Sequence, residues 1–176
     1  VFGYQNQYSV SKEYLSKAID IDNRFFTAWK WRGIVNDELG LYEGALADFS
    51  SAISINPSNS DIYMRRARVS LKTEAYDESL VDLLLAKKYN PKNARIYLYL
   101  GQLYLKLKQL DASRDAIETA LSLKKNYSDA YSLKADILIA EGLFEEAISV
   151  LSNAVDSTKY RRERFYIKRA NLRFKL

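Results

Sequence analysis

Residues 60–93, SDIYMRRARVSLKTEAYDESLVDLLLAKKYNPKN, decide the fold of this chain, because their pattern returns every 34 residues. A ladder of alanines shows the step most clearly. It comprises Ala18, Ala52, Ala86, Ala120 and Ala154. A fixed period near this length indicates a solenoid of stacked supersecondary units instead of a single globular core.

Further columns keep the same step. The first is aromatic and reads Trp29, Tyr63, Tyr97 and Tyr131; the second is small and reads Gly33, Ala67, Gly101 and Ala135. With the aromatic column at position 4 of the unit, the complete repeats are 26–59, 60–93, 94–127 and 128–161. Residues 1–25 form the end of an earlier unit, and 162–176 begin another. In that last segment the register slips by about one residue, so that Tyr166 and Ala170 enter the aromatic and small columns.

Within one unit the apolar residues have helical spacing. In 26–59, Gly40 ends a first helix as a C-terminal glycine does. A second helix follows and ends at Asn56–Pro57, because the residue before a proline resists the helical conformation. Positions 8 and 27 are small where two helices approach closely, within one unit and between successive units. The sequence therefore predicts an all-α solenoid of helix pairs.

These columns resemble the tetratricopeptide repeat (TPR) family. Its pattern has an aromatic residue at position 4, Leu at 7, Gly or Ala at 8, Tyr at 11, Ala at 20, an aromatic or aliphatic residue at 24, Ala at 27 and Pro at 32. The resemblance covers about 8–170 and departs from the family at positions 7 and 20. It implies antiparallel helix pairs in a right-handed superhelix, a single TPR domain over 1–176, and a concave groove lined by first helices that accepts a partner peptide.

Composition excludes several kinds of chemistry. The chain has no cysteine and no histidine, which removes thiol nucleophiles, the usual general base and ordinary zinc ligands. No glycine-rich phosphate loop occurs. The acidic pairs Asp20/Asp22, Asp37/Glu38 and Glu145/Glu146 are interpreted as first-turn helix charges or solvated faces instead of catalytic carboxylates. We therefore expect a non-enzymatic protein with no cofactor and no metal.

The resemblance assigns positions 2, 5, 9, 12 and 13 of each first helix to the groove. In the two middle repeats these positions combine cations with apolar residues, which suits a partner with hydrophobic anchors and acidic groups. The predicted binding residues are Lys30, Met64, Arg68, Lys72, Arg95, Leu98, Gln102 and Lys106. The alternative is a solvated face with no ligand of its own, and Met64 could equally serve in packing.

One kind of TPR ligand is not expected. Co-chaperones of the family grip the carboxylate end of a chaperone tail with Lys, Asn, Asn, Lys and Arg at defined positions. The corresponding residues here are Lys30, Ile34, Arg65, Arg95 and Tyr99. Both asparagines are missing, so we predict that the chain is not a carboxylate-clamp co-chaperone.

The net charge of +5 is unevenly placed, because 159–176 carries eight basic residues against Glu163 alone. A polyanion could bind this segment, but it has no recognised nucleic-acid module. We favour the exposed side of a first helix and do not expect nucleic acid as a partner.

The chain starts and stops inside repeats, so we expect a fragment of a longer TPR protein, or open ends that pair with another copy. No long uncharged apolar stretch occurs, so a soluble protein without a membrane span is expected; the compartment is left open, with the cytoplasm favoured. The predicted function is a protein–protein interaction scaffold. The alternatives are the substrate-selection or targeting region of a larger enzyme, and a self-assembly module.

Overall fold

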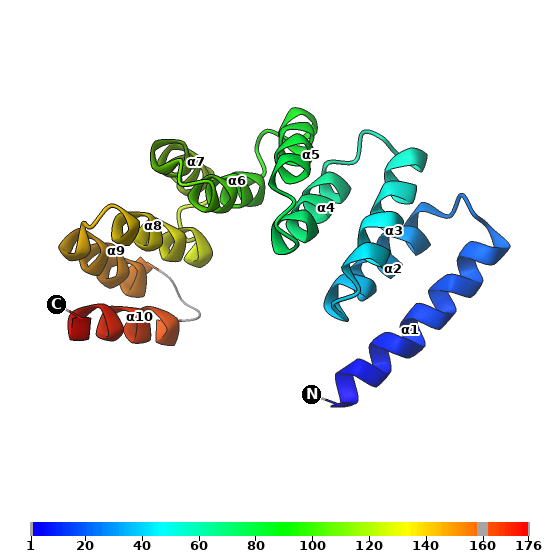
Figure 1. The fold of residues 1–176 in the computed structure, drawn as a ribbon, viewed down its shortest axis with the longest axis horizontal. Coiled ribbons are helices and arrows are strands. Elements are labelled where there is room, and N and C mark those ends of the chain that lie inside the picture. The colour runs from blue at the N-terminus through cyan, green and yellow to red at the C-terminus, as the bar shows by residue number, and fades with distance from the viewer. Residues whose placement is uncertain (1, 158–161, 176) are drawn as a thin grey trace. The chain divides into compact units, whose positions relative to one another are not determined.

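The computed structural model describes residues 2–157 and 162–175, which form ten α-helices and no strand (Figure 1). The helices are α1 (Phe2–Ile21), α2 (Phe26–Glu38), α3 (Tyr42–Ile55), α4 (Ser60–Lys72), α5 (Tyr76–Tyr89), α6 (Ala94–Lys106), α7 (Leu110–Leu123), α8 (Ser128–Ala140), α9 (Phe144–Ser157) and α10 (Arg162–Lys175). The predicted all-α class is confirmed.

The helix starts repeat with the period of the sequence. The first helices α2, α4, α6, α8 and α10 begin 34 residues apart, and so do the second helices α3, α5, α7 and α9. Helix α1 takes the place of a second helix in the preceding partial unit. Each first helix from α2 to α8 packs against the second helix that follows it.

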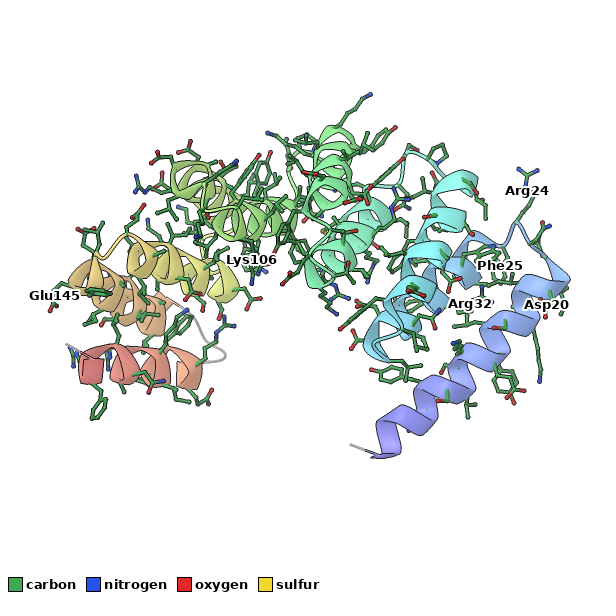
Figure 2. All side chains as sticks on the ribbon, in the orientation of Figure 1. Asp20, Arg24, Phe25, Arg32, Lys106 and Glu145 are labelled. Carbon is green, nitrogen blue, oxygen red and sulfur yellow. The ribbon has the colours of Figure 1, made fainter. Side chains whose placement is uncertain are left out.

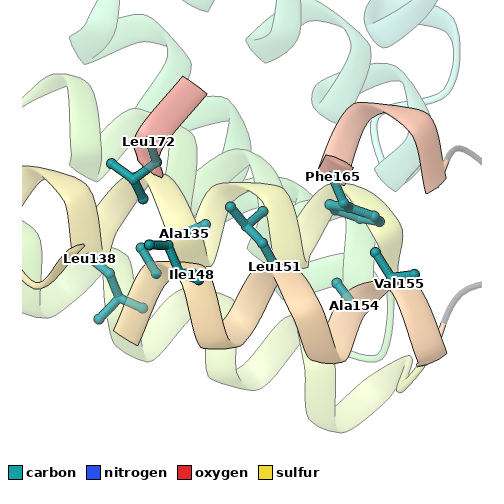
Figure 3. Packing of buried hydrophobic residues seen from close by; sticks show 9 residues of the cluster. Ala135, Leu138, Ile148, Leu151, Ala154, Val155, Phe165 and Leu172 are labelled. Atoms are coloured by element: carbon teal, nitrogen blue, oxygen red, sulfur yellow. The ribbon is translucent and has the colours of Figure 1, made fainter. Parts of the chain in front are cut away.

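The chain divides into two compact units, Val1–Pro91 and Lys92–Leu176. In unit 1, α1 packs on α2 and α3 packs on α4, around a core that includes Phe49, Ile62 and Val69. In unit 2, α7 packs on α8 and α9 on α10, and the core includes Leu151 and Phe165 (Figure 3). That 1–176 forms a single domain stays a prediction.

The small column has the role that its spacing predicts. A Cβ atom built on Gly33 would lie 2.7 Å from the ring of Phe49, which belongs to the second helix of the same repeat. Gly101 is equally crowded, with Ile117 at 2.9 Å. The position-27 alanines of the four complete repeats, Ala52 and Ala86 among them, are fully buried. Helices therefore meet at these columns with no room for a larger side chain.

The turn between the two helices of a repeat needs a left-handed residue at position 15. Gly40 and Gly142 have φ of 74° and 78°, while Glu74 and Lys108 adopt φ of 61° and 58° at the same position. The predicted helix break at Gly40 is confirmed. Helix α3 also ends before Pro57 as expected, and Asn59 then caps α4 through the backbone N–H groups of Asp61 and Ile62.

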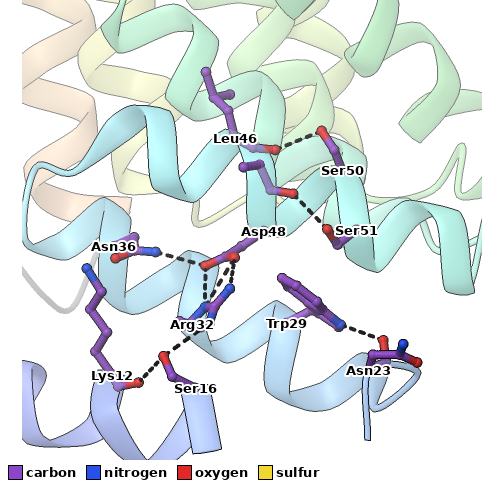
Figure 4. Close-up of polar contacts among 11 residues, drawn as sticks. Lys12, Ser16, Asn23, Trp29, Arg32, Asn36, Leu46, Asp48, Ser50 and Ser51 are labelled. Carbon is purple, nitrogen blue, oxygen red and sulfur yellow. Dashed lines mark hydrogen bonds and ion pairs between the residues drawn. The ribbon is translucent and has the colours of Figure 1, made fainter. Parts of the chain in front are cut away.

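A cation at position 7 ties repeat 26–59 internally and to the unit before it. Arg32 donates to both oxygens of the buried Asp48 on α3, and to Ser16 Oγ on α1 at 3.1 Å (Figure 4). Asn36 also donates to Asp48, at 2.8 Å. At position 7, where the family has leucine, Arg32 therefore replaces an apolar contact with an ion pair to Asp48.

Later segments that have a cation at position 7 also contact the repeat before them, and Arg66 keeps the internal pair as well. Arg66 binds Asp82 at 2.7 Å and donates to Ser50 Oγ at 2.9 Å. The hydrogen bond to Asp82 raises the pKa of Arg66 above its ordinary value, against a smaller opposing effect of burial. Lys134 lies 3.8 Å from Glu118, and Arg169 donates to Ser152 Oγ at 3.1 Å.

The contacts of α10 agree with a one-residue slip in the last segment. With the slip, the buried Phe165 and Leu172 take positions 3 and 10, which are buried in the four complete repeats (Figure 3). Arg169 then takes position 7, as its bond to Ser152 requires. Tyr166 and Ala170 take the aromatic and small positions but are exposed, since no described helix packs on that face.

Candidate functional site

The first helices lie next to one another within each unit, since α2 contacts α4 and α6 contacts α8. The eight predicted binding residues are shared between the units: Lys30, Met64, Arg68 and Lys72 lie on α2 and α4, and Arg95, Leu98, Gln102 and Lys106 lie on α6. Figure 2 labels Lys106 at the end of α6. Each set is therefore a candidate binding face within its own unit.

In unit 1, the carboxylate of Asp37 pairs with two of the predicted binding residues. Its side chain is fully buried near the end of α2 and binds two cations from α4. Arg68 Nη2 donates to one carboxylate oxygen, and Lys72 Nζ donates to the other at 2.6 Å. A carboxylate oxygen of Glu38 also lies 3.9 Å from Arg68 Nη2. The carboxylates of α2 therefore already neutralise the two cations that the sequence assigns to an acidic partner.

The interpretation of the Asp37/Glu38 pair as a solvated face is wrong for Asp37, which is buried and lies far from the first turn of α2. The sequence does indicate this role. Asp37 takes position 12, and Arg68 and Lys72 take positions 9 and 13 of the following repeat, which the resemblance places on the same face. Glu145 and Glu146, by contrast, lie in the first turn of α9 as predicted.

The two apolar residues of the predicted set lie in the interior. Met64 is 3% exposed and Leu98 is 4% exposed. In this conformation neither presents its side chain to a ligand. Ile34, Leu71 and Leu105 are only half-buried at neighbouring positions of the same helices.

The remaining predicted binding residues on α2 and α6 differ in exposure and in the groups that they contact. Lys30 lies over the ring of Trp31, which is 49% exposed, at 5.4 Å from the ring centroid. On α6, Arg95 and Lys106 are exposed and Gln102 is half-buried. Burial raises the pKa of Tyr127, and the charge of Arg95 together with its hydrogen bond to the phenol opposes part of that rise. Lys30, Arg95 and Lys106 are thus best placed to meet acidic groups.

The first helices α8 and α10 form a second polar contact, which the sequence pattern did not reveal. Arg164 binds Asp129 at 2.5 Å, and Lys168 binds Asp136 at 2.5 Å and donates to the carbonyl of Ser132. Three cations of the basic segment, including Arg169, therefore contact α8 or α9. Lys159, Tyr160 and Arg161 lie outside the described residues.

Other kinds of site find no support in the described part of the chain. No group of three or more carboxylates is arranged to hold a metal ion there. None of the described helices is both long enough and apolar enough to cross a membrane. Arg65, which takes a carboxylate-clamp position, is paired with Asp61 of its own helix at 2.8 Å. That the chain lacks a carboxylate clamp stays a prediction.

Sequence models of the tetratricopeptide repeat match this chain in three places, at residues 1–60, 83–137 and 128–159. Together they cover most of the 176 residues and reach into every complete repeat that the period defines. Among curated proteins, no sequence match to this chain is found.

Solved structures share the fold. A thermophilic TPR protein from Thermus thermophilus, TTC0263, superposes with a TM-score of 0.80 at 18% identity, covering 98% of this chain and 94% of that one. A tetratricopeptide repeat protein from Parabacteroides merdae gives 0.82 at 19% identity, covering 98% and 68%. MamA from Desulfovibrio magneticus gives 0.77 at 20% identity, covering 89% and 86%. At these identities the likeness concerns the fold alone.

Proposed function

The chain belongs to the tetratricopeptide repeat family, and from that premise we propose that it binds a partner peptide along its first helices. Proteins of this family generally serve as non-enzymatic scaffolds for protein–protein interaction, and the fold supports that role here. We further propose that the partner carries acidic groups together with apolar anchors, and that the chain itself catalyses no reaction and requires no cofactor.

The observation that carries this proposal is the accessible cationic and aromatic surface of the first helices. In unit 1, the exposed Trp31 lies beside Lys30. In unit 2, Arg95 and Lys106 are exposed at the two ends of α6. Aromatic residues and arginines contribute disproportionately to binding energy at protein interfaces. Lys30, Arg95 and Lys106 would meet the acidic groups, and Trp31 would contact an apolar anchor.

Arg68 and Lys72 have a different role in this proposal. Because Asp37 already binds both, an acidic ligand reaches them only by displacing that carboxylate. Breaking a buried ion pair is costly unless a new partner replaces it. The two residues therefore contribute to selectivity for a strongly acidic ligand more than to affinity for any ligand. Met64, Leu98 and Gln102 support the face or line it.

The experiment compares binding of native-lysate proteins to the wild type and to Arg95→Glu/Lys106→Glu, after circular dichroism confirms equal helix content. Lys87→Glu/Lys88→Glu on the second helix α5 is the matched control. We expect a partner that is retained by the wild type and the control and lost by the first-helix variant. Cross-linking of that partner to α6 would identify the face. Partners retained by all three proteins would contradict the proposal.

A further inference from the structure

A cleft of about 550 Å³ lies in unit 1 and is lined by side chains of α3, of α4 and α5, and of the turn between α4 and α5. These helices are coloured cyan to green in Figure 1. Leu46, Ala75 and Val81 supply its apolar walls, and Ser70 also lines it. This volume falls within the range of protein sites that hold a small ligand or an inserted side chain. All of these residues belong to a single unit, so the cleft is defined by local packing.

One of the residues that line the cleft has a small side chain. Ser70 takes position 11 of its repeat, where the later repeats have Tyr104 and Leu138. The serine is buried, and its carbonyl accepts the backbone N–H of Ala75 at 2.9 Å, as the carbonyl of Tyr104 accepts that of Gln109. The turn after the first helix therefore has the same hydrogen bond in both repeats, and the two differ in the size of the side chain at position 11.

Exposed aliphatic residues extend the cleft along α5. Val81 is 58% exposed, at a position where the other repeats have Ala47, Asp115 and Ser149. Leu84 follows one turn later on the same face and is 49% exposed. Aliphatic side chains this exposed beside an open cleft are typical of a binding surface.

The rim of the cleft is acidic. Arg66 and Asp82 line the cleft but neutralise each other at 2.7 Å. Asp77 and Glu78, in the first turn of α5, are exposed, and no ion pair joins either of them to another residue in the described part of the chain. Glu74 precedes them in the turn and is also exposed. The cleft thus combines apolar walls with uncompensated negative charge.

We propose that this cleft is a second binding site, for a basic peptide segment that inserts one aliphatic or aromatic side chain against Val81 and Leu46. Lysine or arginine residues flanking the anchor would pair with Asp77 and Glu78, which fixes the ligand class by charge complementarity. The site differs in both position and charge from the first-helix face, whose accessible groups are cations. The two sites would therefore bind different segments.

The test uses two capped pentapeptides, acetyl-KKFKK-amide and acetyl-EEFEE-amide, titrated into the protein while methyl NMR spectra report on Val81 and Leu46. We expect the basic peptide to shift these resonances in a saturable manner and the acidic peptide to leave them unchanged. Replacing the central Phe with Ala in the basic peptide should weaken binding by about tenfold or more. Equal shifts with both peptides, or no need for the Phe, would overturn the proposal.

Variants locate the site. Ser70→Tyr fills the cleft with the residue found in the next repeat, and Val81→Lys changes a side chain that is 58% exposed and lies outside the core. Both should abolish binding. Asp77→Lys/Glu78→Lys should do the same by charge. Glu145→Lys/Glu146→Lys is the matched control, because it reverses the same helix positions in a repeat whose position 11 is filled by Leu138.

Unchanged methyl resonances of the core residues Ile62 and Val69 show that each variant of unit 1 is folded. Binding that survives Ser70→Tyr and Val81→Lys, or that is lost equally in the control, would contradict the assignment. Concentration-dependent light scattering provides the last check. A dimer that Ser70→Tyr dissociates would assign the cleft to a second copy of the chain and overturn the proposal of a separate basic partner.

Discussion

At the scale of single residues, the structure places two side chains where glycine suits the backbone better. Glu74 and Lys108 adopt the left-handed conformation at position 15, with φ of 61° and 58°, where the first and fourth repeats have Gly40 and Gly142. A left-handed residue with a Cβ atom costs roughly 1–2 kcal/mol. Glycine removes that strain but loses more conformational entropy on folding.

We therefore expect Glu74→Gly and Lys108→Gly each to raise the free energy of unfolding by about 0.5–1 kcal/mol, the difference between these two effects. Gly142→Ala should lower it by a similar amount, because the alanine meets the same strain. Urea denaturation followed by circular dichroism measures all three. If Lys108→Gly instead lowers the free energy of unfolding, the Lys108 side chain stabilises the fold by more than the left-handed backbone conformation destabilises it.

The crowding at Gly33 gives a second residue-level prediction. Gly33→Ala places a methyl group against the ring of Phe49 and should destabilise the protein by about 1–3 kcal/mol. The next repeat pairs Ala67 with Leu83 at the same two positions. Adding Phe49→Leu to Gly33→Ala should therefore recover part of the loss in a thermal melt, whereas an additive result would show that the two positions do not share one space.

At the scale of helices, the contact between positions 7 and 23 of a repeat occurs as an ion pair in some repeats and as an apolar pair in another. Repeats 26–59 and 60–93 pair an arginine with an aspartate at position 23, and repeat 94–127 has Leu100 and Ala116 at the same positions. A buried aspartate that loses its partner is left uncompensated, while a matched apolar pair needs no charge. Both members must therefore change together.

Arg66→Leu should accordingly lower the free energy of unfolding by about 3 kcal/mol, because the buried Asp82 loses its cation. Arg66→Leu combined with Asp82→Ala, the apolar form, should recover most of that loss. A double-mutant cycle in urea gives the coupling energy directly. If the double variant is no more stable than Arg66→Leu, the polar and apolar forms are not equivalent.

The period placed the helices well, since the helix starts, the breaks at Gly40 and Pro57 and the small columns all follow from spacing in the chain. Contacts between repeats were harder to predict, because they depend on which side chains face each other across a helix pair. The repeat pattern alone assigns Asp37 to solvent, and its partners Arg68 and Lys72 to a ligand. The columns at positions 7 and 23 did carry a signal, because their residue types change together from the second repeat to the third.

At the scale of the whole molecule, the charge distribution bears on the class of partner. Much of the excess positive charge lies in 159–176, but Arg164, Lys168 and Arg169 are used within unit 2 by Asp129, Asp136 and Ser152. Phosphate contacts require cations that are available to release counterions from the nucleic acid. The cluster is therefore a weaker polyanion site than its composition indicates.

We expect no measurable binding of duplex DNA at physiological salt, and weak binding at low salt that falls steeply as salt is added. Fluorescence anisotropy of a labelled duplex, repeated across a salt series, measures both. Asp129→Asn/Asp136→Asn frees two of the cations and should strengthen the low-salt binding. Submicromolar affinity of the wild type at physiological salt would contradict this prediction.

The ties at position 7 also restrict which repeat can follow which. Each cation is matched to one residue of the repeat before it: Arg66 to Ser50, Lys134 to Glu118 and Arg169 to Ser152. An in-frame deletion of residues 94–127 would join Lys134 to a repeat that has Leu84 at that position, with no carboxylate for the ammonium group. Although the modules share one architecture, a module that carries Lys134 is not interchangeable with one that carries an arginine at position 7, and recombination would be penalised where the two kinds of junction are mixed.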